Sequence, residues 1–285
     1  MYKLRLQNAE GKELEFNKLG GPYTITEISG LSPAKATINT SASALLDGAK
    51  FNSSKVNMRT LNLAFAIEKD AEASRLNAYA VIQPKRPITV YYSSPRLNVY
   101  IEGYVESFSV THFARKQVAT VSIVCPFPYF KGMQLMVNEL SIVHGLFHFP
   151  FASTEEPELV FGYLDPLTSI VVENNGGIEC GLTFELYVMN TLSNPKIYNY
   201  QTGEFMQLNV NLQAGDVVTI VTDRGNKSIT LLRDGNKTNL FNYLSLDSTW
   251  LLLEPQGSAF VYEVGTGEAS NLFVTISHRD LYEGV

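Results

Sequence analysis

A pair of alternating strand patterns that ends abruptly lies in the middle of the chain. Every second residue from Val99 to Val105 is apolar or glycine, and the alternation returns at Val121 and Ile123 after a polar break at 114–117. A period of two with such a break is typical of a half-buried β-hairpin with one face against a core. The pattern therefore predicts antiparallel β-structure in this region.

The hairpin runs into a short segment of prolines and aromatic residues: Cys125, Pro126, Phe127, Pro128, Tyr129 and Phe130. The two prolines lack a backbone donor and hold the residues before them extended, so we expect the chain to leave the sheet here. The three aromatic side chains are too apolar for a free linker. We therefore expect an ordered interdomain connection that holds two halves of the chain in a fixed orientation.

Chain length favours two domains. With 285 residues against roughly 100–200 per domain, we place an N-terminal domain at 1–133 and a C-terminal domain at 134–285. Whether 279–285 return to the first domain is left open. Hydrophobic residues at 45% and charged residues at 18% fit a soluble globular chain. No apolar run approaches the ~18 residues of a transmembrane helix, and we expect no membrane contact.

Charge and cysteine content argue against a nucleic-acid-binding protein and against a disulfide-stabilised one. The formal net charge of −6 argues against specific nucleic-acid binding, which needs clustered Lys and Arg. Cys125 and Cys180 lie far apart in the sequence, so free buried thiols are expected rather than a disulfide framework.

The first domain is expected to contain strands around a single helix. Ala36–Leu46 leads into the turn signal Asp47-Gly48, and the chain returns through Lys55–Ile67. Within the returning run, the apolar parity flips between Met58 and Leu61. The flip indicates either a bulge near Arg59 or a strand that changes the face it presents.

Helix formers replace the β-branched residues between Asp70 and about Ile82. Acidic residues stand at the start of this segment, and Pro84 follows its end. The segment therefore predicts a helix, the only substantial one in the chain.

The C-terminal domain shows short strand patterns separated by turn sequences. Apolar residues alternate from Ile178 to Val188, and further strands are predicted at 217–222, 228–232, 258–264 and 272–277. Short strands spaced by Asn, Asp and Gly turns are typical of a β-sandwich or jelly roll. The chain is therefore predicted to be mainly β.

Candidate catalytic groups each have a simpler interpretation. His144 and His148 are four residues apart, but Gly145 stands where a metalloprotease needs Glu. Glu155, Glu156 and Glu158 could hydrolyse a glycoside if rigid strands held them, yet beside Pro157 they are expected to be solvated. No catalytic residue, metal or cofactor is predicted.

Trp250 is the only tryptophan of the chain. An exposed tryptophan could stack on a sugar, whereas Leu251–Leu253 beside it favour a core position. We expect mainly a core role for Trp250 and keep sugar stacking as the alternative.

Beyond these patterns, the chain resembles the distal tail proteins of long-tailed, non-contractile bacteriophages. The similar pieces, in order, are Ile28-Ser-Gly-Leu, Leu46-Asp-Gly-Ala, the strand around Arg59, Gly103-Tyr-Val-Glu-Ser, the Cys125–Phe130 segment, Ala214-Gly-Asp-Val-Val, Thr222-Asp-Arg-Gly-Asn, Ser248-Thr-Trp and Tyr282-Glu-Gly-Val.

The resemblance implies a structural role in the virion, at the tail tip, after synthesis in the host bacterial cytoplasm. The N-terminal domain of the chain would build a homo-hexameric ring. The C-terminal domain would be a galectin-like or carbohydrate-module-like sandwich on the outside of the ring. The ring would join the tail tube protein to a tail-associated fibre, lysin or baseplate, and DNA would pass through it. Asp47, Gly48 and Arg59 are the expected ring contacts.

Two other functions remain open. The first is a carbohydrate-binding protein that engages host cell-wall polysaccharide, with Trp250 as the stacking residue. The second is a glycoside hydrolase that uses the three glutamates at 155, 156 and 158.

Overall fold

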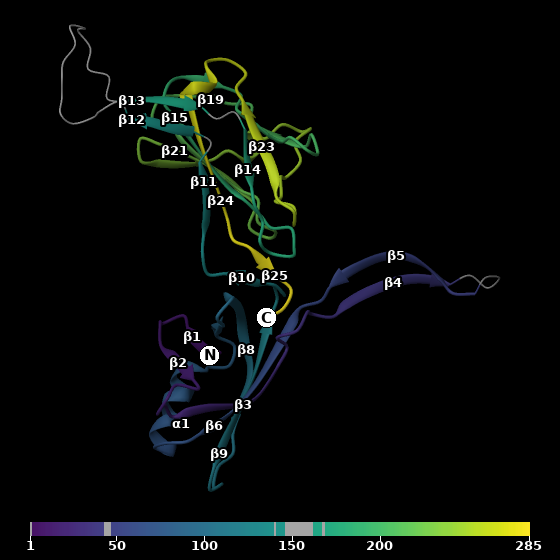
Figure 1. Cartoon of the computed structure of the whole chain (residues 1–285), viewed down its shortest axis with the longest axis vertical. Coiled ribbons are helices and arrows are strands. Elements are labelled where there is room, and N and C mark those ends of the chain that lie inside the picture. Colours follow the sequence, from purple (N-terminus) through teal and green to yellow (C-terminus); the bar gives the residue numbers. More distant parts are fainter. Residues whose placement is uncertain (1, 43–46, 140, 146–161, 167–168) are drawn as a thin grey trace. The chain divides into compact units, whose positions relative to one another are not determined.

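The chain forms two compact units. The first unit contains Met1–Met133 and Leu281–Val285, and the second contains Gln134–Asp280. The computed structural model in Figure 1 describes residues 2–42, 47–139, 141–145, 162–166 and 169–285, and of 141–145 and 162–166 the backbone only. The chain therefore passes from one unit to the other twice, at 133–134 and at 280–281.

Strands dominate the first unit, with one helix after the sixth strand (Figure 1). Its elements are β1 (Lys3–Asn8), β2 (Glu13–Phe16), β3 (Tyr23–Ser29), β4 (Ala36–Ala42), β5 (Ala49–Val56), β6 (Arg59–Ile67), α1 (Ala71–Val81), β7 (Pro87–Ser93), β8 (Asn98–Val110), β9 (Gln117–Cys125), β10 (Phe130–Gly132) and β25 (Leu281–Tyr282). A nine-stranded sheet has the order β2-β1-β7-β8-β9-β6-β3, with β10 beside β8 and β25 beside β10. Strands β4 and β5 pair only with each other.

The core of the first unit gathers around Phe65. Its fully buried ring lies 5.0 Å from the ring of Phe16 and 5.7 Å from that of Tyr23, both with edge-to-face geometry. Helix α1 buries Ser74, Ala78 and Val81, which share one face because helical residues three and four apart are neighbours. The predicted helix is confirmed.

The alternating pattern of the β8–β9 hairpin is confirmed. Val99, Ile101 and Val105 are buried, while Glu102 and Tyr104 between them are exposed. The two strands pair antiparallel, with a register shift between Val105 and Ser107.

The chain leaves the sheet at the prolines, as expected, because β9 ends at Cys125, but it returns to the same sheet with β10 at Phe130. Val124 pairs with Tyr104 of β8, and Lys131 then pairs with Tyr100 of the same strand. Between these two pairs β8 covers four residue steps, whereas the segment from Val124 to Lys131 covers seven, so three residues are extra. The prolines therefore make the chain loop out, after which it rejoins the edge that it left.

The parity flip before β6 marks a change of sheet rather than a bulge near Arg59. Strand β5 ends at Val56 and pairs only with β4, whereas β6 begins at Arg59 and pairs with β3 and β9. The two residues between the strands, Asn57 and Met58, let the chain present its other face in the second sheet.

The second unit contains short strands and two brief 3-10 turns. Its elements are β11 (Met136–Glu139), β12 (Ser141–Gly145), β13 (Gly162–Pro166), β14 (Ser169–Val172), β15 (Thr183–Val188), β16 (Leu192–Ser193), β17 (Lys196–Asn199), β18 (Phe205–Gln207), β19 (Asn211–Leu212), β20 (Val217–Val221), β21 (Ser228–Arg233), β22 (Asn236–Asn239), η1 (Phe241–Tyr243), β23 (Ser258–Glu263), η2 (Ala269–Asn271) and β24 (Leu272–His278).

Two sheets supply most of the core of the second unit. One has the order β11-β24-β15-β20-β21-β22 and the other the order β14-β23-β17-β18. Phe184 of the first sheet and Phe260 of the second are both fully buried, with ring centroids 5.7 Å apart. Face-to-face packing of this kind defines a β-sandwich. The prediction of a mainly β chain with one helix is confirmed for the described residues.

Both cysteines are free and buried, as predicted. Burial raises the pKa of the Cys125 thiol to about 11 and that of the Cys180 thiol to about 12. Both side chains therefore pack as small apolar groups and hold their protons at neutral pH. Among the described residues, no helix has the length and apolar character needed to cross a membrane.

Gly103 of β8 packs directly against β9. A Cβ at this position would lie 2.7 Å from Cγ2 of Ile123 and 2.8 Å from Sγ of Cys125. Gly103→Ala is therefore expected to lower the free energy of unfolding by about 1–3 kcal/mol through overpacking, measured by urea denaturation. Gly177→Ala is the control because a Cβ there meets nothing within 4 Å. Equal effects of the two substitutions would contradict this account of the packing.

Candidate functional site

Arg59, the first residue of β6, is buried in the first unit with 2% of its surface exposed. Its Nε donates to the carbonyl oxygen of Pro128 at 2.7 Å, and Nη1 donates to that of Ser32 at 2.6 Å. Nη1 also donates to the carbonyl of Gly30, and Nη2 to that of Glu283. One guanidinium therefore binds backbone from three separate parts of the sequence.

Aromatic packing completes the surroundings of this guanidinium. Its central carbon lies 4.6 Å from the ring centroid of Phe130, which is fully buried. Burial lowers the pKa of Arg59, and the neighbouring Cys125 and Glu283 partly offset this effect. Because an arginine remains charged in proteins, the carbonyl oxygens and the ring replace the water that burial removes.

The C-terminal segment Leu281–Val285 is one of the three parts that Arg59 joins. Strand β25 pairs with β10 through Phe130↔Tyr282 and Lys131↔Leu281. The amide of Val285 donates to the carbonyl of Leu31 at 3.1 Å. The strands through which the chain leaves the first unit and returns to it are thus hydrogen-bonded to each other.

The proline and aromatic segment lies within the first unit. Cys125 and Phe130 are buried, Pro126 is exposed, and the residues between are half-buried. The rings of Phe127 and Tyr129 meet edge to face at 5.4 Å. The segment is thus packed, and its role in fixing the orientation of the two units stays a prediction.

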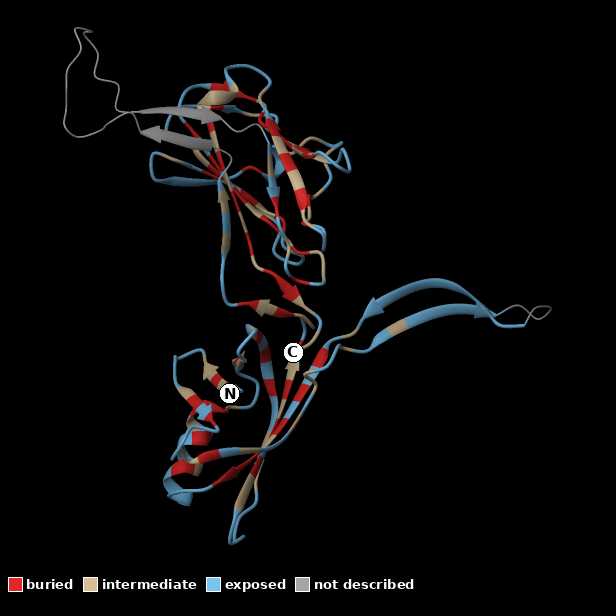
Figure 2. Cartoon of the chain, viewed as in Figure 1, coloured by how far each residue is buried: buried red, intermediate tan, exposed pale blue. Residues whose placement is uncertain are grey.

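The β4–β5 hairpin, residues 36–56, is the most exposed secondary structure of the first unit, as Figure 2 shows in pale blue. Every described residue of it except the half-buried Thr37 is exposed, including Ile38 at 63% and Phe51 at 60%. Asp47 and Gly48 are exposed just before β5, and Gly48 has a φ of 91°. The hairpin therefore presents apolar side chains with no core of its own.

Of the three predicted ring contacts, Asp47 and Gly48 are therefore exposed, whereas Arg59 is buried. Within the unit, the donors of Arg59 are used by backbone carbonyls. Ring contacts by these residues stay predictions.

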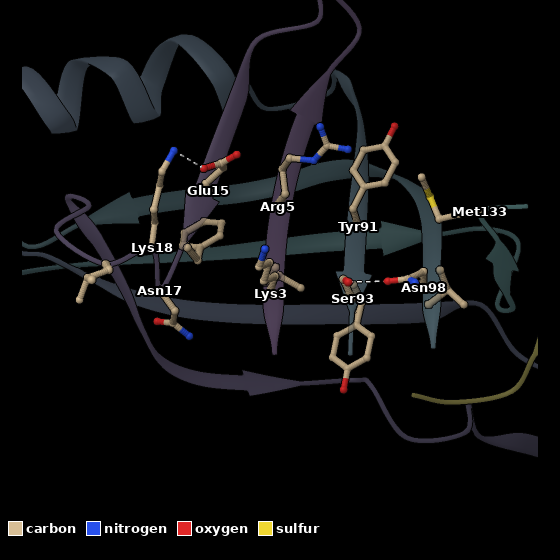
Figure 3. A pocket seen from close by; sticks show the side chains of 14 residues that line it. Lys3, Arg5, Glu15, Asn17, Lys18, Tyr91, Ser93, Asn98 and Met133 are labelled. Atoms are coloured by element: carbon tan, nitrogen blue, oxygen red, sulfur yellow. Dashed lines mark hydrogen bonds and ion pairs between the residues drawn. The ribbon is translucent and has the colours of Figure 1, made fainter. Parts of the chain in front are cut away.

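A pocket of about 730 Å³ opens at the ends of β1, β2, β7 and β8 (Figure 3). Arg5 points toward Tyr91 here, with its guanidinium carbon 4.2 Å from the ring centroid, and it pairs with Glu13 at 2.5 Å. Lys18 pairs with Glu15 at 2.8 Å, which raises the pKa of Lys18 and lowers that of Glu15. The pocket is thus a recess with paired charges, and nothing in it resembles an activated nucleophile. No sequence pattern predicted this pocket, although charged and apolar residues alternate along β1 and β2.

Trp250 is half-buried, so the expectation of a core position is wrong. Leu251 and Leu253 beside it are the buried residues. The ammonium of Lys227 lies 4.9 Å from the Trp250 ring centroid, and the ring of Phe241 lies 5.6 Å away. Sugar stacking at Trp250 stays a prediction.

The other candidate catalytic groups lie outside the described part of the chain. These are the side chains of His144 and His148 and the three glutamates at 155, 156 and 158. Among the residues that the structure describes, no three His, Cys, Asp or Glu side chains gather in a group that could hold a metal ion.

His278 is a buried histidine at the end of β24, with 3% of its surface exposed. Its Nε2 lies 3.4 Å from Oδ1 of Asp280, and neither ring nitrogen forms a hydrogen bond to the described residues. Burial lowers the pKa of His278, and the Asp280 carboxylate partly opposes this effect. The folded chain therefore favours the neutral imidazole.

Comparison with known proteins shows what the C-terminal part of this chain is similar to. Residues 175–282 match the family model of the siphovirus-type tail component, C-terminal domain. The matched range contains most of the second unit and the first two residues of the C-terminal segment that returns to the first unit. The resemblance to phage tail proteins is confirmed over this range.

Solved structures extend the likeness in fold to the whole chain. The crystal structure of SPP1 Dit, described as a paradigm of the hub adsorption apparatus in phages infecting Gram-positive bacteria, has a TM-score of 0.67 at 13% identity. The match covers 98% of this chain and 98% of that chain. A chain of the phage P2 baseplate in its activated conformation with Ca has a TM-score of 0.52 at 11% identity and covers 100% of both chains. No curated protein matches the chain by sequence.

Removal of the Arg59 guanidinium should destabilise the first unit strongly. Arg59→Met leaves buried carbonyls without a donor, so the free energy of unfolding is expected to fall by about 3 kcal/mol or more. Arg59→Lys should lower the free energy of unfolding by less than Arg59→Met, because an ammonium keeps the charge. It should still lower it, because an ammonium cannot reproduce the planar fork of donors. Urea denaturation measures both, with the exposed Arg96→Met as control. A loss no larger than that of the control would contradict the role of Arg59.

The buried imidazole predicts a pH dependence of stability. Because the folded pKa of His278 lies below the ordinary 6.5, the unfolded chain takes up the proton first as the pH falls. Stability from this group is therefore present above about pH 6.5 and lost below it, with a slope of up to about 1.4 kcal/mol per pH unit.

His278→Gln should remove this part of the slope in urea denaturation between pH 7 and pH 5. The exposed Arg96→Gln removes no group that titrates in this range and is the control. An unchanged slope in the His278 variant would contradict the assignment.

Proposed function

We propose that the chain is a structural protein of a phage tail tip, in which six copies form a ring. The ring would connect the tail tube to a tail-associated fibre, lysin or baseplate, and the chain would carry no enzymatic activity. The protein would be made in the host bacterial cytoplasm and reside in the virion. The net charge of −6 is compatible with a channel that passes DNA without holding it.

The exposed β4–β5 hairpin is the observation that carries this proposal. Two strands alone are marginally stable in water, because a hairpin buries little apolar surface. Here Ile38 and Phe51 are more than half exposed, and each strand has one open edge in the described structure. An open edge with apolar side chains invites pairing with another chain. A neighbouring copy would supply the missing partner.

A closed ring suits such a surface better than an open pair. If the hairpin of one copy docks on a different surface of the next, the contact is heterologous and repeats around a ring. Closure then covers every hairpin and leaves no open end. The first unit, which carries the hairpin, would build the ring, and the second unit would lie outside it.

The structural relatives support the tail-tip assignment. Of the two solved chains with the same fold, one is a paradigm of a hub adsorption apparatus and the other is part of a baseplate. The family model at 175–282 describes a tail component. A structural adaptor needs surfaces that bind neighbouring proteins rather than an active site, and the described residues include exposed apolar surface in the β4–β5 hairpin.

A charge placed on the hairpin should disrupt the ring. Six copies of a 31.7 kDa chain weigh about 190 kDa, and wild type is expected to sediment as such a species. Phe51→Asp would place a carboxylate in the proposed apolar contact and shift the protein to monomer in sedimentation velocity. Leu246→Asp, at a residue 101% exposed in the second unit, is the control and should keep the ring. A wild-type monomer at high concentration would refute the proposal.

A further inference from the structure

The tip of the β8–β9 hairpin, residues 111–116, exposes an aromatic side chain completely. Phe113 is 104% exposed, more than any other large apolar side chain among the described residues, and its φ is 62°. Buried residues alternate with more exposed ones along the two strands, and exposed residues form the end of the hairpin (Figure 2).

The conformation of Phe113 is one that folding alone would not select. A bulky residue in the left-handed region is an outlier, because its Cβ crowds the following carbonyl. Glycine adopts this conformation without strain. Phe113 therefore combines backbone strain with an apolar surface in water, and neither contributes to a core. Features of this kind are typical of sites that bind a partner.

Several contacts hold the tip in place. Thr111 and Val118 close its base, with the amide of Thr111 donating to the carbonyl of Val118 at 2.9 Å. Helix α1 supports one side, where the ring of Tyr79 meets that of Phe108 edge to face at 5.6 Å. Lys116 pairs with Glu68 at 2.9 Å. Because the base is fixed, little side-chain and loop freedom would be lost on binding.

The charge around Phe113 indicates the chemistry of its partner. The tip carries Arg115 and Lys116 and no acidic residue, in a chain of net charge −6. Lys116 pairs with Glu68, which leaves Arg115 to face a partner. An aromatic anchor beside arginine is the composition of a binding hot spot. Positive charge at the rim favours a partner with carboxylates around an apolar pocket.

Another copy of this chain complements the tip poorly. The pocket in Figure 3 is lined by a single carboxylate, Glu15, and this carboxylate already pairs with Lys18. The pocket therefore offers no unpaired carboxylate to the tip. DNA is also disfavoured, because a phosphate backbone needs more cations than the tip supplies and Lys116 is already paired.

We propose that Phe113 anchors the chain in an acid-rimmed apolar pocket of a different tail protein, with Arg115 facing the acidic rim. The identification of that partner as a tail protein rests on the proposed function. The contact itself does not require six copies or a closed ring.

The test uses the full-length chain immobilised for biolayer interferometry. The probes are the purified tail tube protein and the purified tail-associated protein of the same phage, each titrated to tens of micromolar. Phe113→Gly should weaken binding of one of them by about tenfold or more. Arg115→Glu should slow its association and remove the salt dependence of the rate. Leu246→Gly, at an equally exposed apolar residue, should bind as wild type.

Two further readouts separate a docking role from a structural one. Phe113→Gly should melt at the same temperature as wild type or higher, because glycine relieves the left-handed strain. Its mass in sedimentation velocity should equal that of wild type. A wild-type monomer that still binds through Phe113 would refute the ring and leave this contact standing.

The remaining outcomes would overturn the inference. These are wild-type binding by the Phe113→Gly variant, no binding of either probe by wild type, a lower mass of the Phe113→Gly variant, and Phe113-dependent binding of double-stranded DNA in place of the proteins. A lower mass would instead make the tip a contact between copies.

Discussion

The first unit depends on one buried charge that is solvated by backbone. The guanidinium of Arg59 donates to backbone carbonyls in three parts of the chain. They belong to Gly30 and Ser32 after β3, to Pro128 in the proline segment, and to Glu283 near the C-terminus. A buried cation is tolerated only while its hydrogen-bond acceptors are in place. The three parts must therefore assemble together, although the whole second unit separates Glu283 from the other two in the sequence. This cooperativity keeps β10 and β25 paired and so sets where the chain leaves and re-enters the first unit.

Two surfaces outside this core expose apolar groups, whereas the core buries a charged one. The β4–β5 hairpin and the tip at Phe113 expose apolar side chains, and no described residue of the first unit buries them. Both features lie on strands that continue from well-packed neighbours, β6 for the hairpin and β9 for the tip. A rigid core that presents exposed apolar groups is suited to assembly, because the partner surfaces lose little freedom when they meet.

Local patterns predicted the local elements well and the long-range ones poorly. The period of two located the buried face of β8, and the composition at 71–81 located α1, because both patterns arise within a few neighbouring residues. The parity flip was detected, but a change of sheet and a bulge produce the same local signal. The return of β25 and the rejoining of β10 depend on pairing partners distant in sequence or across a loop. Burial of Arg59 was not foreseen either, since charged residues are seldom buried and its acceptors are backbone atoms that every residue carries.

The central claim is that the first unit builds a ring by burying its exposed hairpin on a neighbouring copy. Amide hydrogen exchange of residues 49–56, followed by mass spectrometry at low and high protein concentration, tests it most directly. The account predicts fast exchange in the dilute monomer and strong protection in the assembled protein, while amides of β15 in the sandwich exchange at the same rate in both. Fast exchange of 49–56 in an assembled ring would contradict the claim.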